Sequence, residues 1–429
     1  MKTSIFNAAL CIMMLFAGSV SAQESAASRG EYVARLANCI ACHSVPEGEP
    51  FAGGLKMAVP FVGEIYTTNI TPDRDTGIGN YTFEDFDAAM RKGMAKDGHN
   101  LYPAMPYPSY AKMTQEDIRA LYDFFMKEVK PVRQPNRPSD IPGWKNVRWA
   151  LSIWNFFFLD DKPYKIKENH DVSWNRGAYL VQGPGHCGAC HTPRGWLFQE
   201  KGLDESDSDF LAGAPLDNWS SPSLNGDINS GLGRWSAQDI AEFLKSGKNQ
   251  FGTAFGTMVE VTNNSTHHMT DADLNAIGVY LKSLPPVRER NATPWSYRES
   301  TAAALHSPFT QPGAATYFQF CVSCHAASGN GYQPHPALAG NPVVLDPDPV
   351  SLINLTLNGS LRIIAGGQHE IYTMPYMRVL LSDQEIADVV TFIRTGWGNN
   401  ASAVKAAQVA AVRAATDPVK SDIVVLRMK

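Results

Sequence analysis

Cysteine and histidine recur together three times along the 429-residue sequence, always as two cysteines with two residues between them and a histidine directly after. The three units are Cys39-x-x-Cys42-His43, Cys187-x-x-Cys190-His191 and Cys321-x-x-Cys324-His325. Two thiols at this spacing can each add across one vinyl group of a porphyrin, and the adjoining imidazole can bind the iron. The pattern therefore predicts three covalent c-type haems, with the six cysteines as attachment points and the three histidines as proximal iron ligands.

Zinc binding and disulfide chemistry are weaker interpretations of these cysteines. A structural zinc site needs four ligands that close a tetrahedron, and each unit lacks an obvious fourth partner. A thioredoxin-like pair would accompany alternating strands and helices, and the sequence shows no such alternation. The seventh cysteine, Cys11, lies in an N-terminal segment that we expect to be removed. With the other six assigned to thioethers, no disulfide is predicted.

Methionines supply candidates for the second axial position of each iron. Methionine is typical of an electron carrier there, because its thioether favours ferrous iron and raises the potential. Each unit has one upstream of its last helix, and these are Met105, Met258 and Met374. Proline follows Met105 and Met374 and excludes a helix, so both sulfur atoms are expected on extended loops.

The second unit leaves this choice more open. No proline follows Met258. Its competitors are Met269, His267 and His268. A histidine in that position would give a bis-histidine iron of lower potential. Met258 is the preferred ligand.

The last helix of each unit, its closing helix, must help to position these ligands. Each begins with threonine or serine followed three residues later by an acid, which is typical of a helix N-terminus. The expected helices span about Thr114–Lys127, span about Thr270–Ser283 and begin at Ser382. The first two units also share an Arg-Gly-x-Tyr segment, at 29–32 and 176–179, and this repetition indicates a duplicated domain.

The N-terminus is typical of an export signal. Lys2 precedes an apolar stretch, and Val20-Ser21-Ala22 offers small residues before a cleavage that would leave Gln23 first. We expect location at the periplasmic face of the cytoplasmic membrane, where bacteria attach haem covalently; a retained membrane anchor is the alternative. Later apolar runs are shorter than the roughly 18 residues that span a bilayer. The net charge of −5 does not suggest a nucleic-acid partner.

Two further segments have two interpretations each. Residues 148–159 contain Trp149, Trp154, Phe156, Phe157 and Phe158. They predict either a plug buried between haem domains or a patch for a membrane face or partner subunit. The tail after Gly398 predicts a weakly amphipathic helix, either as an interfacial anchor or packed on the third domain. Dinucleotide, serine-elbow and metalloprotease motifs are absent from the sequence, so we expect no unaided oxidation of an organic substrate.

Segments outside the haem motifs resemble one protein family. They are Gly53-Gly54, the stretch YTTNITP at 66–72, the stretch LYPAMPYPSY at 101–110 and Trp397-Gly-Asn. Together with the three motifs they resemble the triheme cytochrome c subunit of bacterial membrane-bound dehydrogenases acting on gluconate, alcohols, aldehydes, sorbitol or fructose. The resemblance implies a mainly α protein of three tandem class I cytochrome c domains, each a small helical bundle around one covalent haem.

The same resemblance implies partners and ligands. A flavoprotein or quinoprotein large subunit, with a possible small subunit, would oxidise the substrate, and the haems would pass electrons to ubiquinone in peripheral contact with the membrane. The family's axial methionines carry over onto Met105, Met258 and Met374. A gluconate 2-dehydrogenase-like complex is the preferred interpretation. Alternatives are a subunit of a quinoprotein alcohol or aldehyde dehydrogenase, a free periplasmic carrier, or a haem enzyme with an open iron site.

The expected boundaries follow the motifs and the proline-rich linkers. We expect a signal peptide at 1–22, cytochrome c domains at 23–140, 172–290 and 305–398, an aromatic-rich linker at 141–171 and a C-terminal tail at 399–429.

Overall fold

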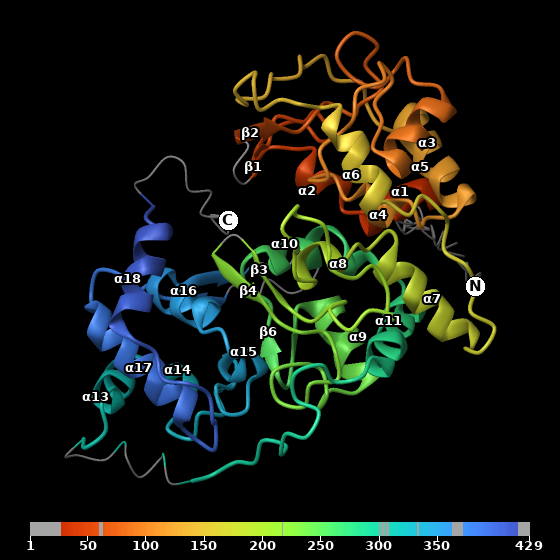
Figure 1. Ribbon diagram of the computed structural model, residues 1–429. Helices are drawn as coiled ribbons and strands as arrows, with labels where there is room; N and C mark the ends of the chain where they lie inside the picture. The colour runs from red at the N-terminus through yellow and green to blue at the C-terminus, as the bar shows by residue number, and fades with distance from the viewer. Residues whose placement is uncertain are drawn as a thin grey trace, which may run out of the picture.

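The computed structural model describes residues 27–59, 63–216, 218–299, 301, 305, 309–332, 334–362 and 372–418. The predicted signal peptide and the last part of the tail lie outside these residues. The described chain is mainly helical, and its named strands form four two-stranded antiparallel sheets. Figure 1 shows three helical units in chain order, the first red to yellow, the second green and the third blue.

The first unit is built on a crossing of its first and last helices, α1 and α5. Its elements are α1 (Arg29–Leu36), α2 (Cys39–Cys42), β1 (Lys56–Val59), β2 (Gly63–Tyr66), α3 (Phe83–Lys92), α4 (Tyr107–Tyr110) and α5 (Gln115–Lys127). The Thr114 side chain accepts a hydrogen bond from the Asp117 amide at 3.2 Å, so the predicted start of α5 is confirmed. Ile118 and Leu121 of α5 are fully buried in the core of this unit.

The second unit repeats this plan, with α7 packed against α11. Its elements are α7 (Val172–Gln182), α8 (Gly188–His191), β3 (Ala214–Leu216), β4 (Trp219–Ser221), α9 (Ala237–Ser246), β5 (Lys248–Asn249), β6 (Gly252–Thr253), α10 (Thr257–Asn264), the 3-10 helix η1 (Thr266–His268) and α11 (Asp271–Ser283). Thr270 caps α11 as predicted, accepting from the Asp273 amide at 3.2 Å.

The third unit places α13 against α17. Its elements are α13 (Ala314–Phe320), α14 (Val322–His325), α15 (Pro342–Leu345), α16 (Val350–Asn358), β7 (Ser360–Arg362), β8 (Tyr372–Met374), α17 (Asp383–Thr395) and α18 (Ala406–Ala415). Ser382 caps α17, as predicted. In the tail, α18 packs on α16 and α17, and Arg413 pairs with Asp383 at 2.7 Å. The described part of the tail is therefore packed on the third unit.

A glycine lies where the first and closing helices cross in every unit. A Cβ atom on Gly30, Gly177 or Gly313 would lie 2.2, 2.0 or 2.3 Å from the carbonyl oxygen of Ala120, Ala276 or Asp388, respectively. Real Cβ atoms do not approach backbone oxygens this closely, so these crossings require glycine. The close approach fixes each first helix, which leads directly into the cysteine-bearing turn, against the closing helix.

The first two units contact each other through reciprocal hydrogen bonds. Tyr32 Oη of the first unit donates to the Asp273 carboxylate of the second at 2.7 Å, and Tyr179 Oη of the second donates to Asp117 of the first at 2.5 Å. Within each unit the arginine of the Arg-Gly-x-Tyr segment pairs with that same aspartate, at 2.8 and 2.7 Å. The duplicated sequence thus also forms a pseudo-twofold contact between the two copies.

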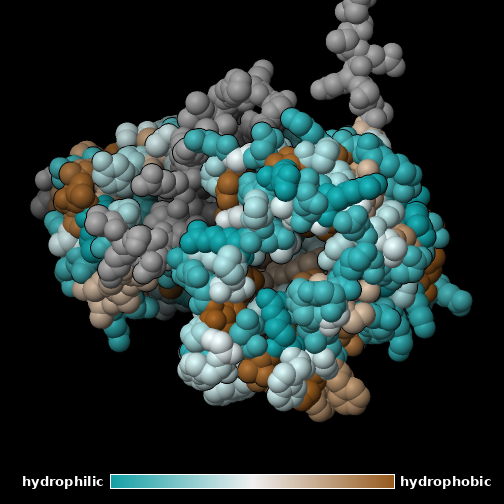
Figure 2. All heavy atoms as spheres, turned by 90° about the horizontal axis from the view of Figure 1, so that it is seen from above, coloured by the Kyte–Doolittle hydropathy of each residue, from teal (hydrophilic) through white to brown (hydrophobic). Residues whose placement is uncertain are grey.

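The aromatic linker forms α6 (Ala150–Phe158), which lies against the first unit (Figure 1). Tyr107 Oη donates to the Asn155 side chain at 2.7 Å and holds the helix there. The buried-plug interpretation is wrong, because α6 has no buried residue and Phe156 is 82 % exposed. Figure 2 shows a mostly hydrophilic face with apolar residues gathered along its lower edge. In the described part of the chain, no helix has the length and apolar character needed to cross a bilayer.

Candidate functional site

The three cysteine pairs lie in the same structural position of their units. Each pair lies at a single helical turn after the first helix: α2 contains both of its cysteines, whereas Cys187 and Cys321 are the N-cap residues of α8 and α14. Cysteines three residues apart on one turn share a face, which presents both thiols to one edge of a planar ring. All six are half-buried. Burial raises the pKa of Cys39, Cys187 and Cys321 to about 12, so these thiols are neutral in the polypeptide.

The three predicted proximal histidines share one hydrogen bond. Nδ1 of His43, His191 and His325 lies 2.7, 2.8 and 3.0 Å from the backbone oxygens of Thr68, Pro222 and Pro336, respectively. A carbonyl accepts only, so the bond places the proton on Nδ1 and leaves the Nε2 lone pair free for a metal. Burial lowers the pKa of all three imidazoles, which favours this neutral form.

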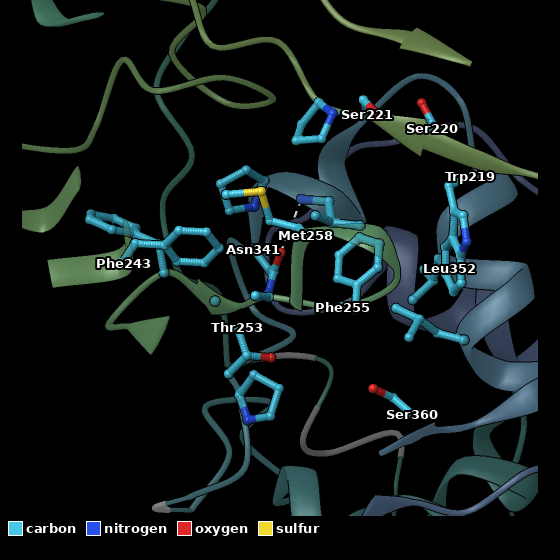
Figure 3. Close-up of a pocket in the computed structure, with 18 of the residues that line it drawn as sticks. Trp219, Ser220, Ser221, Phe243, Thr253, Phe255, Met258, Asn341, Leu352 and Ser360 are labelled. Atoms are coloured by element: carbon cyan, nitrogen blue, oxygen red, sulfur yellow. Dashed lines mark hydrogen bonds between the residues drawn. The ribbon is translucent and has the colours of Figure 1, made fainter. Parts of the chain in front are cut away.

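One cavity connects the predicted sites of the second and third units. It is lined by Cys187, Cys190, His191 and Met258 and also by Cys321, Cys324, His325 and Met374. The structure therefore brings together each predicted ligand set of these two units and joins the two sets. Figure 3 shows Phe243 and Met258 of the second unit facing the same space as Asn341 and Leu352 of the third.

The polar atoms in this cavity are consistent with a haem. Among the described residues, the buried side-chain atoms without a hydrogen-bond partner include Asn38 Oδ1, Trp235 Nε1 and Thr257 Oγ1, and all three residues line the cavity. Buried donors normally find a partner. An indole N–H and a hydroxyl inside an otherwise apolar cavity suit carboxylate groups at the edge of a porphyrin, so the residues present fit the group. Sequence analysis missed these residues; Trp235 aligns with Tyr81 in the internal repeat, which was the available signal.

The candidate axial methionines differ in local structure. Met374 lies on β8 opposite Ser360, in the extended conformation expected before proline. Met105 packs on the same core cluster as Cys39, but it lies in a turn and not on the predicted extended loop, because its amide donates to the Tyr102 carbonyl at 3.2 Å and its carbonyl accepts from the Tyr107 amide at 2.8 Å. Met258 lies in the first turn of α10, because no proline stops the helix there. The three candidate methionines thus lie in three different kinds of backbone structure: a strand, a turn and a helix.

The competing groups of the second unit have other roles. Met269 lines the same cavity, but it is 4 % exposed and belongs to the hydrophobic core. His267 Nδ1 lies 3.0 Å from the Lys245 carbonyl, and His268 Nε2 lies 3.0 Å from the Asn263 carbonyl. Neither histidine lines the cavity that contains His191, whereas Met258 does, so Met258 remains the preferred ligand.

A buried acid lies beside the second motif. Glu200 has a side chain that is 6 % exposed, and its carboxylate approaches the backbone of Gly188 between Cys187 and Cys190. Burial raises the pKa of Glu200 to about 7, and the Arg194 guanidinium, 3.7 Å away, partly opposes that shift. Arg194 also donates to the Ala189 carbonyl at 2.6 Å. Sequence analysis did not single out Glu200, because its burial depends on the fold.

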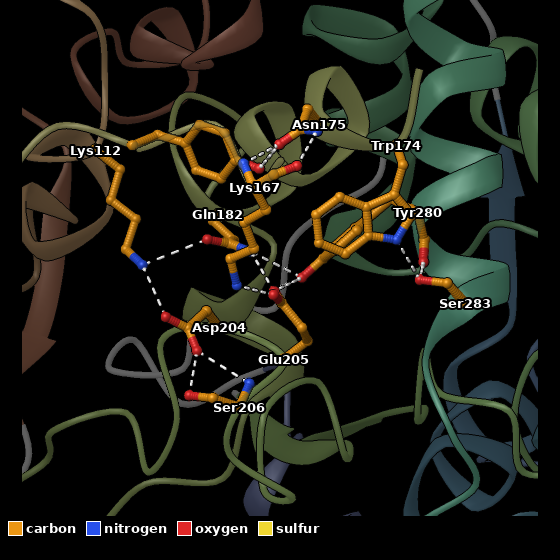
Figure 4. A network of polar contacts seen from close by, with 11 residues as sticks. Lys112, Lys167, Trp174, Asn175, Gln182, Asp204, Glu205, Ser206, Tyr280 and Ser283 are labelled. Carbon is orange, nitrogen blue, oxygen red and sulfur yellow. Dashed lines mark hydrogen bonds and ion pairs between the residues drawn. The ribbon is translucent and has the colours of Figure 1, made fainter. Parts of the chain in front are cut away.

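Polar contacts also connect the first unit to the second unit, close to Glu200 in the sequence. Figure 4 shows Lys112 of the first unit reaching Gln182 and Asp204 of the second, at 3.4 and 3.5 Å. Gln182 in turn donates to Glu205 at 2.8 Å, and Tyr280 Oη donates to the same carboxylate at 2.8 Å. The network buries a lysine together with acidic partners, which compensates its desolvation. It fixes the first unit against the segment that follows the second haem motif.

The sequence matches the family model described as Cytochrome c over residues 27–128 and 310–397. The "Alcohol dehydrogenase (quinone), cytochrome c subunit" of Gluconacetobacter polyoxogenes is 49 % identical over 95 % of this chain and 89 % of that protein. The "Gluconate 2-dehydrogenase cytochrome c subunit" of Pantoea cypripedii is 46 % identical over 91 % and 90 %. The "Fructose dehydrogenase cytochrome subunit" of Gluconobacter japonicus is 38 % identical over 92 % and 84 %. Each of these relatives is named as a cytochrome subunit of a dehydrogenase.

Proposed function

Because the chain belongs to the family of cytochrome c subunits of dehydrogenases, we propose that it carries three covalent haems and passes electrons from a dehydrogenase subunit to ubiquinone. Its role is electron transfer within an oxidoreductase complex, and it is not the catalytic subunit. Membership of the cytochrome c family implies covalent haem c. The number of haems, their ligands and the electron acceptor are parts of the proposal.

The cysteines and histidines would hold the haems. Cys39 and Cys42, Cys187 and Cys190, and Cys321 and Cys324 supply the thioethers, and His43, His191 and His325 supply Nε2 to iron. The shared Nδ1 bonds to backbone carbonyls support this assignment, because they orient each ring and increase its strength as a ligand. When bound, each haem iron accepts and gives up one electron at a time.

A methionine would supply the remaining protein ligand of each iron. Met105, Met258 and Met374 are proposed as the axial ligands opposite the histidines. The positions of Met258 and Met374 in the cavity that also contains His191 and His325 support the second and third assignments. A thioether keeps the potential high enough for a respiratory electron carrier and closes the iron against small ligands.

The electron donor would be a dehydrogenase that acts on a CH–OH group. A flavin-containing gluconate 2-dehydrogenase-like subunit is the preferred partner, with a small subunit in the complex. A quinoprotein alcohol dehydrogenase is the second candidate, and the 49 % identity to the corresponding cytochrome subunit favours it. The complex would lie at the periplasmic face of the cytoplasmic membrane, after cleavage of the signal peptide near Ala22, in peripheral contact with the bilayer.

The observation that carries the proposal is the cavity that two complete Cys-Cys-His-Met sets line together. Two haems in one cavity would be neighbours, which is the arrangement a relay requires. This neighbouring arrangement of two ligand sets supports a role in electron transfer.

The proposal is tested by purifying the membrane complex with its native partners and adding gluconate or ethanol anaerobically. We expect one of the two substrates to reduce all three haems within turnover time and added ubiquinone-1 to reoxidise them. The optical spectrum should show low-spin haem with a band near 695 nm, an approximate marker of methionine ligation. Haems that stay oxidised with either substrate, or high-spin iron that binds carbon monoxide rapidly, would contradict the proposal.

A further inference from the structure

A second cavity lies between the first and second units, and the relay proposed above does not use it. Its volume is about 540 Å³, within the range of small-molecule sites in proteins. Three segments form its walls: the loop that carries Met105, helix α6, and residues 199–207 after the second haem motif. Cys190 and Ala189 line it as well. The cavity therefore lies between the loop around Met105 and the turn that carries Cys190.

The walls of this cavity differ in polarity. Trp154, Phe157 and Phe158 contribute aromatic rings from α6. The polar part of the lining comes from Arg194, Glu200 and Gln199, in the segment after His191. Glu200 is nearly fully buried and lies 3.7 Å from Arg194. A planar ring with carbonyl groups on its edge fits these walls, because aromatic side chains stack on its faces and polar groups bond its oxygens.

The mouth of the cavity continues into exposed apolar surface. Phe157 lines the cavity and is also 68 % exposed. The Trp154 indole donates to the Leu197 carbonyl at 2.9 Å, which joins α6 to the neighbouring hairpin. Leu197 is 60 % exposed and Trp196 is 99 % exposed. Contiguous exposed apolar side chains of this kind mark contact with lipid or a partner, and a ligand with a long apolar tail could leave the cavity over them.

From these observations, and resting on the proposed function, we propose that this cavity binds the head group of the lipid quinone acceptor. Its ring lies between the aromatic residues of α6 and the pair Arg194 and Glu200, and its tail passes over Phe157 and Leu197 toward the membrane. At this site one quinone takes two electrons in succession from the haem held by Cys190 and two protons from solvent, and it leaves as the quinol. The electrons come from the substrate that the dehydrogenase partner oxidises.

Photoaffinity labelling locates the site without relying on turnover. The intact complex in detergent is irradiated with a short-tailed azido-ubiquinone, and the labelled peptides are identified by mass spectrometry. We expect labels within residues 150–158 or 194–207, and we expect excess decyl-ubiquinone to suppress them. Labels only in other segments of the complex, or labels in these segments that decyl-ubiquinone does not suppress, would overturn the proposal.

Two variants and a matched control test the same site by affinity. Phe157→Ala and Arg194→Gln should each weaken binding of decyl-ubiquinone about fivefold or more, and Phe157→Ala should leave reduction of ferricyanide by substrate unchanged. Phe156→Ala removes a neighbouring exposed ring of the same helix that does not line the cavity, and it should change affinity less than twofold. Parental affinity in both Phe157→Ala and Arg194→Gln would overturn this proposal. If substrate fails to reduce the haems of the parental complex, the proposed function fails instead, and the labelling result still decides the site.

Discussion

At the scale of single residues, the proximal histidines show how a local bond prepares a ligand. Each Nδ1 faces a backbone oxygen, so the ring cannot rotate freely and its Nε2 has a fixed direction. These histidines are predictable from the sequence, because covalent attachment demands a fixed spacing. Their carbonyl partners are not, because Thr68, Pro222 and Pro336 lie 25, 31 and 11 residues away along the chain.

Met258 is the axial ligand with the most competition, and a substitution can identify it. Met258→His should leave the haem attached but lower the potential of one haem by on the order of 0.1 V, a part of the ~0.8 V range that axial ligands span. Spectroelectrochemical titration measures this shift. Met269→Leu, which removes the competing sulfur but keeps an apolar core residue, should leave all three potentials in place. A shift in the Met269 variant alone would assign the ligand to Met269.

Glu200 should make the potential of the second haem depend on pH. Burial raises its pKa to about 7, so the side chain is a neutral acid below that pH and a carboxylate above it. A nearby negative charge stabilises ferric haem, so the potential should fall as the pH rises from 6 to 8, by less than ~59 mV per pH unit. Glu200→Gln should flatten this slope, whereas Asp209→Asn, an exposed acid of the same segment, should not. Equal slopes in all three proteins would contradict the assignment.

At the scale of elements, short-range signals proved sufficient. Thr114, Thr270 and Ser382 were predicted to begin the closing helices, and all three cap them. The capping pattern is readable because it depends on residues only three positions apart. The aromatic linker was harder, since a run of tryptophan and phenylalanine is compatible with burial or exposure. Only the placement of α6 against the first unit, with no buried residue and with Phe156 and Phe157 exposed, distinguishes the two.

The glycine crossings yield a stability prediction. Gly177→Ala places a methyl group on the Ala276 carbonyl, so α7 and α11 must separate. Overpacking of this kind costs about 1–3 kcal/mol, and thermal unfolding of the haem-loaded protein should show a lower midpoint. Gly143→Ala is the matched control, because nothing lies within 4 Å of the added atom. A Gly177→Ala protein that unfolds at the parental temperature would show that the crossing tolerates a side chain.

At the scale of the whole molecule, duplication does more than repeat a haem site. The tyrosine of each Arg-Gly-x-Tyr segment reaches the closing helix of the other copy, so the two copies are held together by the repeat itself. The repeat was visible in the sequence. The exchange between copies was not, because Tyr32 and Asp273 are 241 residues apart. For the same reason the cavity shared by the second and third units was not predictable.

The reciprocal bonds can be removed without removing packing. A Tyr32→Phe, Tyr179→Phe double variant loses two bonds to carboxylates, each worth roughly 1.5–3 kcal/mol, and it should exchange amide hydrogens faster in α1 and at the start of α11. Tyr66→Phe is the control, since its hydroxyl bonds Asp140 within the first unit at 2.8 Å. Unchanged exchange in the double variant would mean that other contacts, such as the Lys112 network, hold the two units together.

The electron-transfer role depends on three covalent haems in this chain, and the mass of the mature protein measures their number. The chain, produced in a host that matures c-type cytochromes, is denatured, extracted with acid–acetone and weighed intact by mass spectrometry. We expect a mass equal to the processed polypeptide plus three haems, with a loss of one haem in a Cys187→Ala, Cys190→Ala variant. A parental mass with fewer than three haems, or haem that the solvent removes, would contradict it.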